Sequence, residues 1–168
     1  MEKLNVAIAD DNERMTDILG QMIEEDKELA LVGKAHNGEE ICNIIREKEP
    51  DVVILDMIMP KMDGLSVMDT VNRDHDIRKH PSFIIITAVG QERITEDAFR
   101  KGASYYILKP FSARLLQVRL RNLIDNRLRL QSFFADKTSL RKIICTGWKC
   151  RSFGAEDKSG KSCNGYDT

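Results

Sequence analysis

Short, wholly apolar runs alternate along the first 110 positions with longer stretches in which apolar and polar residues are mixed. A short run without polar residues is typical of a strand that is buried on both faces. Four runs of this kind end at a polar or charged residue: residues 6–9, 52–55, 83–86 and 106–108. A fifth run, residues 29–35, is broken by Gly33 and Lys34 and predicts a more exposed strand.

The stretches between the runs carry helical patterns. An apolar stripe with helical spacing predicts an amphipathic helix that packs on a sheet, and the first stripe consists of Met15, Ile18, Leu19, Met22 and Ile23. Similar stripes follow Asn37-Gly38 and Ser112. We expect Ser112 to cap the helix that follows it and Gly102 to end the helix before it.

Five strand–helix repeats predict an α/β fold. This alternation is typical of a doubly wound parallel sheet with helices on both faces. The flavodoxin-like strand order 2-1-3-4-5 is common among such sheets, and we expect it for these five strands.

Chemically active residues follow four of the five predicted strands: Asp10-Asp11, Asp56, Thr87-Ala88 and Lys109-Pro110. The carboxyl ends of parallel strands meet at one edge of the sheet, and open α/β sheets bind ligands along that edge. The sequence therefore predicts one crevice that holds three carboxylates, a hydroxyl and an ammonium group.

Three neighbouring carboxylates repel one another unless a cation neutralises them. A hard divalent ion such as Mg²⁺ takes oxygen ligands, which Asp11, Asp56 and the backbone carbonyl of Ile58 can supply, and Ca²⁺ can occupy the same oxygen site. Asp56 is then the candidate nucleophile, because carboxylates form acyl-phosphate intermediates. Lys109 would neutralise charge on the transferred phosphoryl group.

Two further residues suit the same chemistry. The Thr87 hydroxyl is expected to contact a phosphoryl oxygen, and the small Ala88 leaves the backbone N–H accessible. Each motif also has a structural interpretation when it is taken alone. Asp10-Asp11 is a common helix cap, Asp56 a strand exit, and Lys109-Pro110 a turn.

The remaining candidate residues favour structural roles. The histidines His36, His75 and His80 lack the spacing of metal ligands, and we expect all three at the solvated surface. Cys42 lies on an apolar helix stripe and is expected to be buried and inert. Tyr106 is an aromatic residue near a strand end, which is usually a packing position.

Four stretches together resemble the response-regulator receiver domain of two-component signalling: residues 9–12, 55–64, 86–88 and 108–111. The resemblance covers roughly residues 1–127 and implies that Asp56 accepts a phosphoryl group from a histidine kinase or a histidine phosphotransfer protein. It implies a metal site at Asp10, Asp11, Asp56 and the Ile58 carbonyl. The protein would then be a signalling switch rather than an enzyme.

The resemblance also implies how the switch operates. Thr87 and Lys109 would contact the phosphoryl group, Tyr106 would rotate inward, and the Lys109-Pro110 bond would be cis. A homodimer would form through the fourth helix, the fifth strand and the fifth helix. Residues 87–92 and 101–111 are similar to the subfamily of stage-zero sporulation protein A, whose members control transcription at the start of sporulation.

Residues 128–168 are expected to form a basic tail. Residues 127–168 hold nine of the 26 Lys and Arg but only four of the 27 Asp and Glu. The segment is too short to bury the core of a complete effector domain, so DNA binding would belong to a domain not seen in this chain. A truncated, frame-shifted or partial sequence explains its absence. The cysteines Cys145, Cys150 and Cys163 predict neither a zinc site nor a disulfide.

The composition is that of a soluble globular protein, with 32% charged and 42% hydrophobic residues and a net charge of −1. No apolar run is long enough to span a membrane and no signal peptide precedes the first strand, so we expect a cytoplasmic protein without a membrane partner.

Three classes of function fit these observations. The first is the receiver of a transcription factor, and the second is a stand-alone receiver that carries phosphoryl groups in a relay. The third is a Mg²⁺-dependent aspartyl-phosphate hydrolase. Members of that class carry the motif Asp-x-Asp-x-Thr after the first strand, and this chain lacks it.

Overall fold

The computed structural model describes residues 3–88 and 90–129. The chain divides into two units, Met1–Asp125 and Asn126–Thr168, and the fold and site described below belong to the first unit. The predictions for the basic tail from residue 130 onward lie outside the described residues, as do those for Cys145, Cys150 and Cys163.

Strands and helices alternate throughout the first unit. Their bounds are β1 Leu4–Ala9, α1 Glu13–Glu24, β2 Leu29–Ala35, α2 Gly38–Lys48, β3 Val52–Leu55, α3 Gly64–Arg73, β4 Ser82–Thr87, α4 Glu92–Arg100 and β5 Ala103–Leu108. A further helical segment begins at residue 113 and continues to residue 129, the last described residue.

The five strands form one parallel sheet in the order β2-β1-β3-β4-β5. The predicted fold class and strand order are therefore confirmed. The edge strand β2 is only partly buried over most of its length, which also agrees with the sequence. The strand β5 begins at Ala103, three residues before the apolar run that predicted it.

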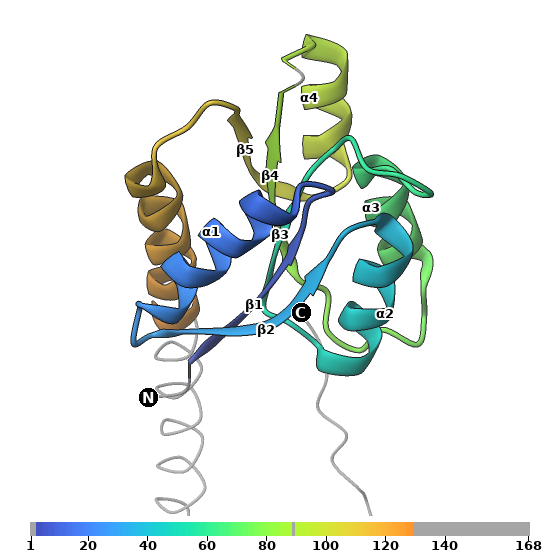
Figure 1. Cartoon of the computed structure of the whole chain (residues 1–168). Coiled ribbons are helices and arrows are strands. Elements are labelled where there is room, and N and C mark those ends of the chain that lie inside the picture. Colours follow the sequence, from blue (N-terminus) through green and yellow to red (C-terminus); the bar gives the residue numbers. More distant parts are fainter. Residues whose placement is uncertain (1–2, 89, 130–168) are drawn as a thin grey trace, which may run out of the picture. The chain divides into compact units, whose positions relative to one another are not determined.

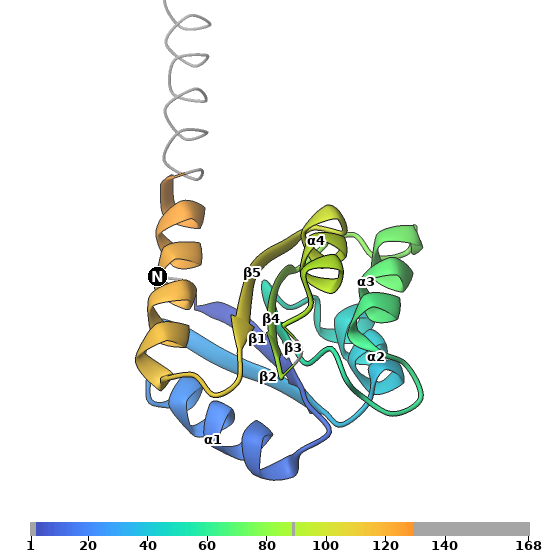
Figure 2. The ribbon, with the colours of Figure 1, turned by 90° about the horizontal axis from the view of Figure 1, so that it is seen from above.

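Alternate side chains of each strand enter two separate cores. In β3, Val52 and Ile54 pack with α1 and the helical segment from residue 113, whereas Val53 and Leu55 pack with α2 and α3. Figures 1 and 2 show the strands between these two groups of helices, with α4 on the same side as α2 and α3. Cys42 is buried in the second core, and burial raises the pKa of its thiol, as expected for an inert cysteine.

Local capping agrees with the sequence at two helix ends. The Ser112 hydroxyl accepts a hydrogen bond from the Leu115 backbone N–H at 3.3 Å. Gly102 follows α4 with a φ of +99°, a conformation that residues with a Cβ rarely adopt. Among residues 3–88 and 90–129, no helix combines the length and apolar character needed to span a membrane.

Candidate functional site

The loop between β1 and α1 carries the first two acidic residues at the carboxyl edge of the sheet. Asp10 is buried with 2% of its surface exposed, whereas Asp11 is exposed. The cap of α1 is Asn12, whose side chain accepts hydrogen bonds from two backbone N–H groups of the first turn. The interpretation of Asp10-Asp11 as the helix cap is therefore wrong, and both carboxylates are available for other chemistry.

The third carboxylate follows β3. Asp56 is buried with 6% of its surface exposed, and its backbone N–H donates to the Ala9 carbonyl at 2.8 Å. Its Oδ1 accepts a hydrogen bond from the Ile58 backbone N–H at 3.2 Å. Gly64 packs directly behind it, because a Cβ at that position would lie 2.6 Å from the Asp56 carbonyl oxygen. The loop after β3 thus folds tightly around its aspartate.

Lys109 connects the two buried aspartates. Its ammonium nitrogen lies 2.7 Å from Oδ2 of Asp10 and 2.6 Å from Oδ2 of Asp56. Burial by itself lowers the pKa of Lys109, but the hydrogen bonds to the two carboxylates and their charges outweigh it and raise that pKa above its ordinary value. The lysine is therefore held in its charged form, and the Lys109-Pro110 peptide bond that follows is cis.

The three carboxylates form a compact cluster. Oxygen atoms of Asp10, Asp11 and Asp56 all lie within 4.8 Å of one another. Lys109 contacts only two of them, and within the described part of the chain the Asp11 carboxylate has no ion pair or hydrogen bond. One ammonium group cannot balance three charges, and an all-oxygen donor set suits a hard divalent cation, so the residues present fit Mg²⁺.

Residues of β4 and β5 complete the edge. Thr87 is fully buried, and its carbonyl accepts a hydrogen bond from the Lys109 backbone N–H at 2.8 Å. Ala88 is exposed beside it. Tyr106 is half-buried against the second core, with its ring centroid 6.5 Å from that of Phe99 on α4. The carboxyl ends of the strands thus bring Asp10, Asp11, Asp56, Thr87, Ala88 and Lys109 to one edge of the sheet.

One residue of this edge was misjudged from the sequence. His36 directly follows β2, is half-buried, and places its ring Nδ1 3.3 Å from the Asp10 backbone carbonyl oxygen. The prediction that all three histidines are solvated is therefore wrong for His36, although His75 and His80 are exposed. The signal that could have identified His36 is its position at the carboxyl end of a strand, which is shared by the other site residues.

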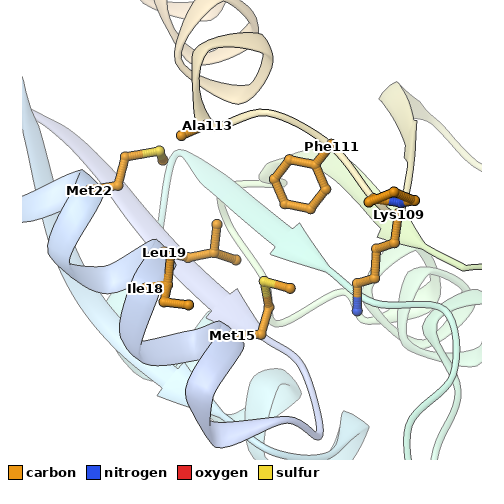
Figure 3. Close-up of a pocket in the computed structure, with 8 residues that line it drawn as sticks. Met15, Ile18, Leu19, Met22, Lys109, Phe111 and Ala113 are labelled. Atoms are coloured by element: carbon orange, nitrogen blue, oxygen red, sulfur yellow. The ribbon is translucent and has the colours of Figure 1, made fainter.

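An apolar groove of about 510 Å³ lies beside the carboxylate cluster. Figure 3 shows its lining from α1, with Met15, Ile18, Leu19 and Met22, opposite Phe111 and Ala113, and with Lys109 at one end. Ile18 of this lining is 60% exposed.

The family model of the response regulator receiver domain matches residues 6–121. The chain belongs to the response regulator receiver family. Receivers are phospho-accepting signalling switches of two-component systems, take phosphoryl groups from histidine kinases or phosphotransfer proteins, and bind Mg²⁺ through acidic residues. The carboxylate cluster at the sheet edge of this receiver is an arrangement of that kind.

Solved receivers share the fold. A CheY from Borrelia burgdorferi, in a complex with CheX, BeF3 and Mg²⁺, is 28% identical with a TM-score of 0.66, and the match covers 73% of this chain and 90% of that one. A LuxR-family DNA-binding response regulator from Staphylococcus aureus is 27% identical with a TM-score of 0.65, covering 71% and 98%. The receiver domain of NarL from Mycobacterium tuberculosis is 25% identical with a TM-score of 0.66, covering 73% and 98%.

Proposed function

We propose that this receiver is phosphorylated on Asp56 and that Asp10, Asp11, Asp56 and the Ile58 carbonyl hold the Mg²⁺ ion. The observation that carries the proposal is the convergence of three carboxylates and one ammonium group within a few ångströms at the sheet edge. The similar CheY from Borrelia burgdorferi, whose complex contains Mg²⁺ and BeF3, supports the choice of ion.

The transfer is a displacement at phosphorus. A carboxylate oxygen of Asp56 attacks the phosphorus of a donor phosphohistidine, the P–O bond forms as the P–N bond breaks, and the imidazole leaves with a proton. The three carboxylates and the Ile58 carbonyl would hold a Mg²⁺ ion, which would supply positive charge that offsets the charge of the phosphoryl group. Lys109 exchanges part of its contact with Asp56 for the phosphoryl group, while the Thr87 hydroxyl and the Ala88 N–H donate to it.

The test is phosphorylation by acetyl phosphate and Mg²⁺, read by intact mass. Wild type is expected to gain one phosphate, and Asp56→Ala is expected to gain none. A matched control is Asp63→Asn, which removes another carboxylate of the same loop but keeps a side chain able to cap α3. Folded wild type without phosphate, or Asp56→Ala that still accepts one, would contradict the proposal.

The exposed Ile58 predicts a slow self-dephosphorylation. Its side chain is 57% exposed two residues after the acceptor, and an apolar group there cannot orient an attacking water. We expect a lifetime of minutes or longer, which shortens when Ile58 is replaced by Glu or Asn. A lifetime of seconds that such replacement leaves unchanged would refute this role.

Homodimerisation after phosphorylation is supported by the surface of α4, β5 and the following helix. The exposed apolar side chains of these elements include Phe99, Leu108, Leu115 and Val118. The half-buried Tyr106 packs against Phe99 of this surface, with ring centroids 6.5 Å apart, and its rotation would couple the surface to the site. We expect acetyl phosphate to shift wild type towards a dimer in sedimentation velocity, and Leu108→Lys to remain monomeric while it is still phosphorylated.

The regulatory role that we propose is control of transcription at the start of sporulation, through an effector domain that binds DNA. It is supported by the similarity of residues 87–92 and 101–111 to the stage-zero sporulation protein A subfamily. A sporulation phosphotransfer protein should then phosphorylate wild type at least tenfold faster than a chemotaxis kinase does. Equal rates would argue against this assignment.

The alternative is a stand-alone phosphoryl carrier. The groove next to Lys109 favours it, because a carrier must dock a histidine protein on both the giving and the receiving step. Phosphorylated protein should in that case return its phosphoryl group to a histidine phosphotransfer protein within seconds. An Ile18→Lys variant should lose this transfer but keep the reaction with acetyl phosphate.

A further inference from the structure

The orientation of Asp10 is fixed at every polar atom. Its backbone N–H donates to the Ala35 carbonyl at 3.2 Å, and its Oδ1 accepts from the Asn12 N–H at 3.0 Å. Its Oδ2 accepts from Lys109, and its carbonyl oxygen lies 3.3 Å from Nδ1 of His36. The two backbone contacts come from the end of β2, the strand next to β1.

The His36 contact has only one possible direction. A carbonyl oxygen accepts hydrogen bonds and cannot donate them, so the contact is a hydrogen bond in the tautomer whose Nδ1 carries the proton. In that tautomer the ring donates to the carbonyl of Asp10, while Lys109 donates to the carboxylate of the same residue. Without this donor, the peptide that joins Asp10 to Asp11 has no contact with β2 on its carbonyl side.

The turn that carries His36 is itself held firmly. The His36 backbone N–H donates to Oε2 of Glu40 at 2.9 Å, and the buried Asn37 donates to Oε1 of the same carboxylate at 2.6 Å. Gly38 packs against the loop after β3, because a Cβ there would lie 2.4 Å from the Met62 carbonyl oxygen. The turn is therefore fixed between the loop of the acid pair and the loop of the acceptor.

We propose that His36 is a positioning residue for the acid pair, whose imidazole donates to the Asp10 carbonyl and so sets the direction of the Asp10 and Asp11 carboxylates towards the metal. The proposal rests on the metal site described above. It assigns His36 no contact with the ion or the phosphoryl group. Its effect is on the affinity of the site and not on the phosphoryl-transfer step.

The experiment is a calorimetric titration of the full-length chain with MgCl2, without phosphoryl donor. His36→Leu should raise the Mg²⁺ dissociation constant roughly two- to tenfold, the range that the loss of one hydrogen bond produces. His36→Asn should recover most of the affinity, because its amide N–H lies near the position of Nδ1. His80→Leu, a substitution of an exposed histidine, should match wild type.

A measurement on the metal-free wild type keeps the proposal testable if His36→Leu fails to fold. Long-range ¹H–¹⁵N spectra should show the neutral His36 ring protonated on Nδ1, and the Nε2–H form would overturn the proposal. Equal Mg²⁺ affinities of wild type and His36→Leu would overturn it while leaving the metal site intact. A wild type that binds no Mg²⁺ would overturn the metal site and the proposal together.

Discussion

The helices α1 and α4 both begin just after a loop of the candidate site, but they are held very differently. In α1, five of twelve residues are buried, and the Asn12 side chain caps the first turn. In α4, only Ala98 of nine residues is buried, and Gln91 makes no side-chain cap. The charged Lys34 of β2 also ties α1 to the sheet through Asp17 at 2.8 Å.

This difference separates a fixed side of the site from a movable one. The acid pair that we propose binds the cation stands before the anchored helix, where motion would weaken the affinity. Thr87 and Ala88 stand before the weakly anchored helix. The polar contacts of this segment with α3 lie just after the other end of α4, at Lys101. Its ammonium group forms an ion pair with Asp69, and its backbone carbonyl accepts a hydrogen bond from Asn72 at 2.8 Å. We therefore expect a phosphoryl group to displace α4 at a smaller cost in packing than α1.

Substitutions of core residues are expected to show the difference between α1 and α4 most strongly. Ile23 of α1 is fully buried, so Ile23→Ala should lower the free energy of unfolding by about 2–5 kcal/mol. Ile94 of α4 is only half-buried, and Ile94→Ala should cost at most about 1.5 kcal/mol. Urea denaturation monitored by circular dichroism measures both. Equal losses would show that α4 is anchored as firmly as α1.

Hydrogen exchange measures the difference between α1 and α4 in the unmutated protein. The amides of α4 should exchange at least roughly tenfold faster than those of α1, because opening α4 exposes less apolar surface. Phosphorylation by acetyl phosphate should change exchange in α4 and β5 more than in α1. Uniform protection of the two helices, followed residue by residue by NMR, would be the opposite result.

The helix caps should give changes of about 1 kcal/mol with opposite signs. Asn12→Ala removes a cap that accepts two backbone N–H groups and should destabilise the protein by about that amount. Gln91→Ser offers α4 a cap that it lacks and should stabilise it by up to a similar amount. If Gln91→Ser also slows the response to phosphorylation, the loose start of α4 is part of the switch.

The smallest effect concerns the ion pair of α1. The hydrogen bond from Lys34, followed by its charge, lowers the pKa of Asp17 below its ordinary value. A carboxyl group with a lowered pKa in the folded state stabilises the fold above its unfolded pKa, and this contribution disappears as the pH falls through the folded value. The melting temperature should therefore fall slightly less between pH 5 and pH 3 in Asp17→Asn than in wild type. Lys34→Met should show the same shallower slope.

The sequence predicted the fold and the convergence of the site because both depend on simple periodicity. Apolar runs identify strands that are buried on both faces, and parallel pairing then brings whatever follows them to one edge. Asp56 and Lys109 are 53 positions apart in the chain but could be placed together in this way. The stripe of α1 was predicted in part: Leu19, Met22 and Ile23 are buried, whereas Ile18 is exposed.

Features that depend on side-chain direction or on lateral packing were not predictable in this way. Nothing in the spacing of His36 shows that its ring turns towards the Asp10 carbonyl rather than towards water. Likewise, three consecutive polar residues precede α1, and only the backbone geometry shows that Asn12 is the one that caps. The sequence of α4 has too few apolar residues to indicate a stripe. Accordingly, only one residue of this helix is buried.

Gly64 illustrates how a residue can be essential to a site that it never enters. It lacks the Cβ that would lie 2.6 Å from the Asp56 carbonyl oxygen, and so it leaves the space that the backbone of Asp56 occupies. In a saturation mutagenesis screen scored by signalling output, we expect this position to reject even alanine and so to resemble a chemically active residue. The results of such a screen will therefore contain positions that reject substitution for steric reasons next to positions that reject it for chemical reasons. Only the structure distinguishes the two.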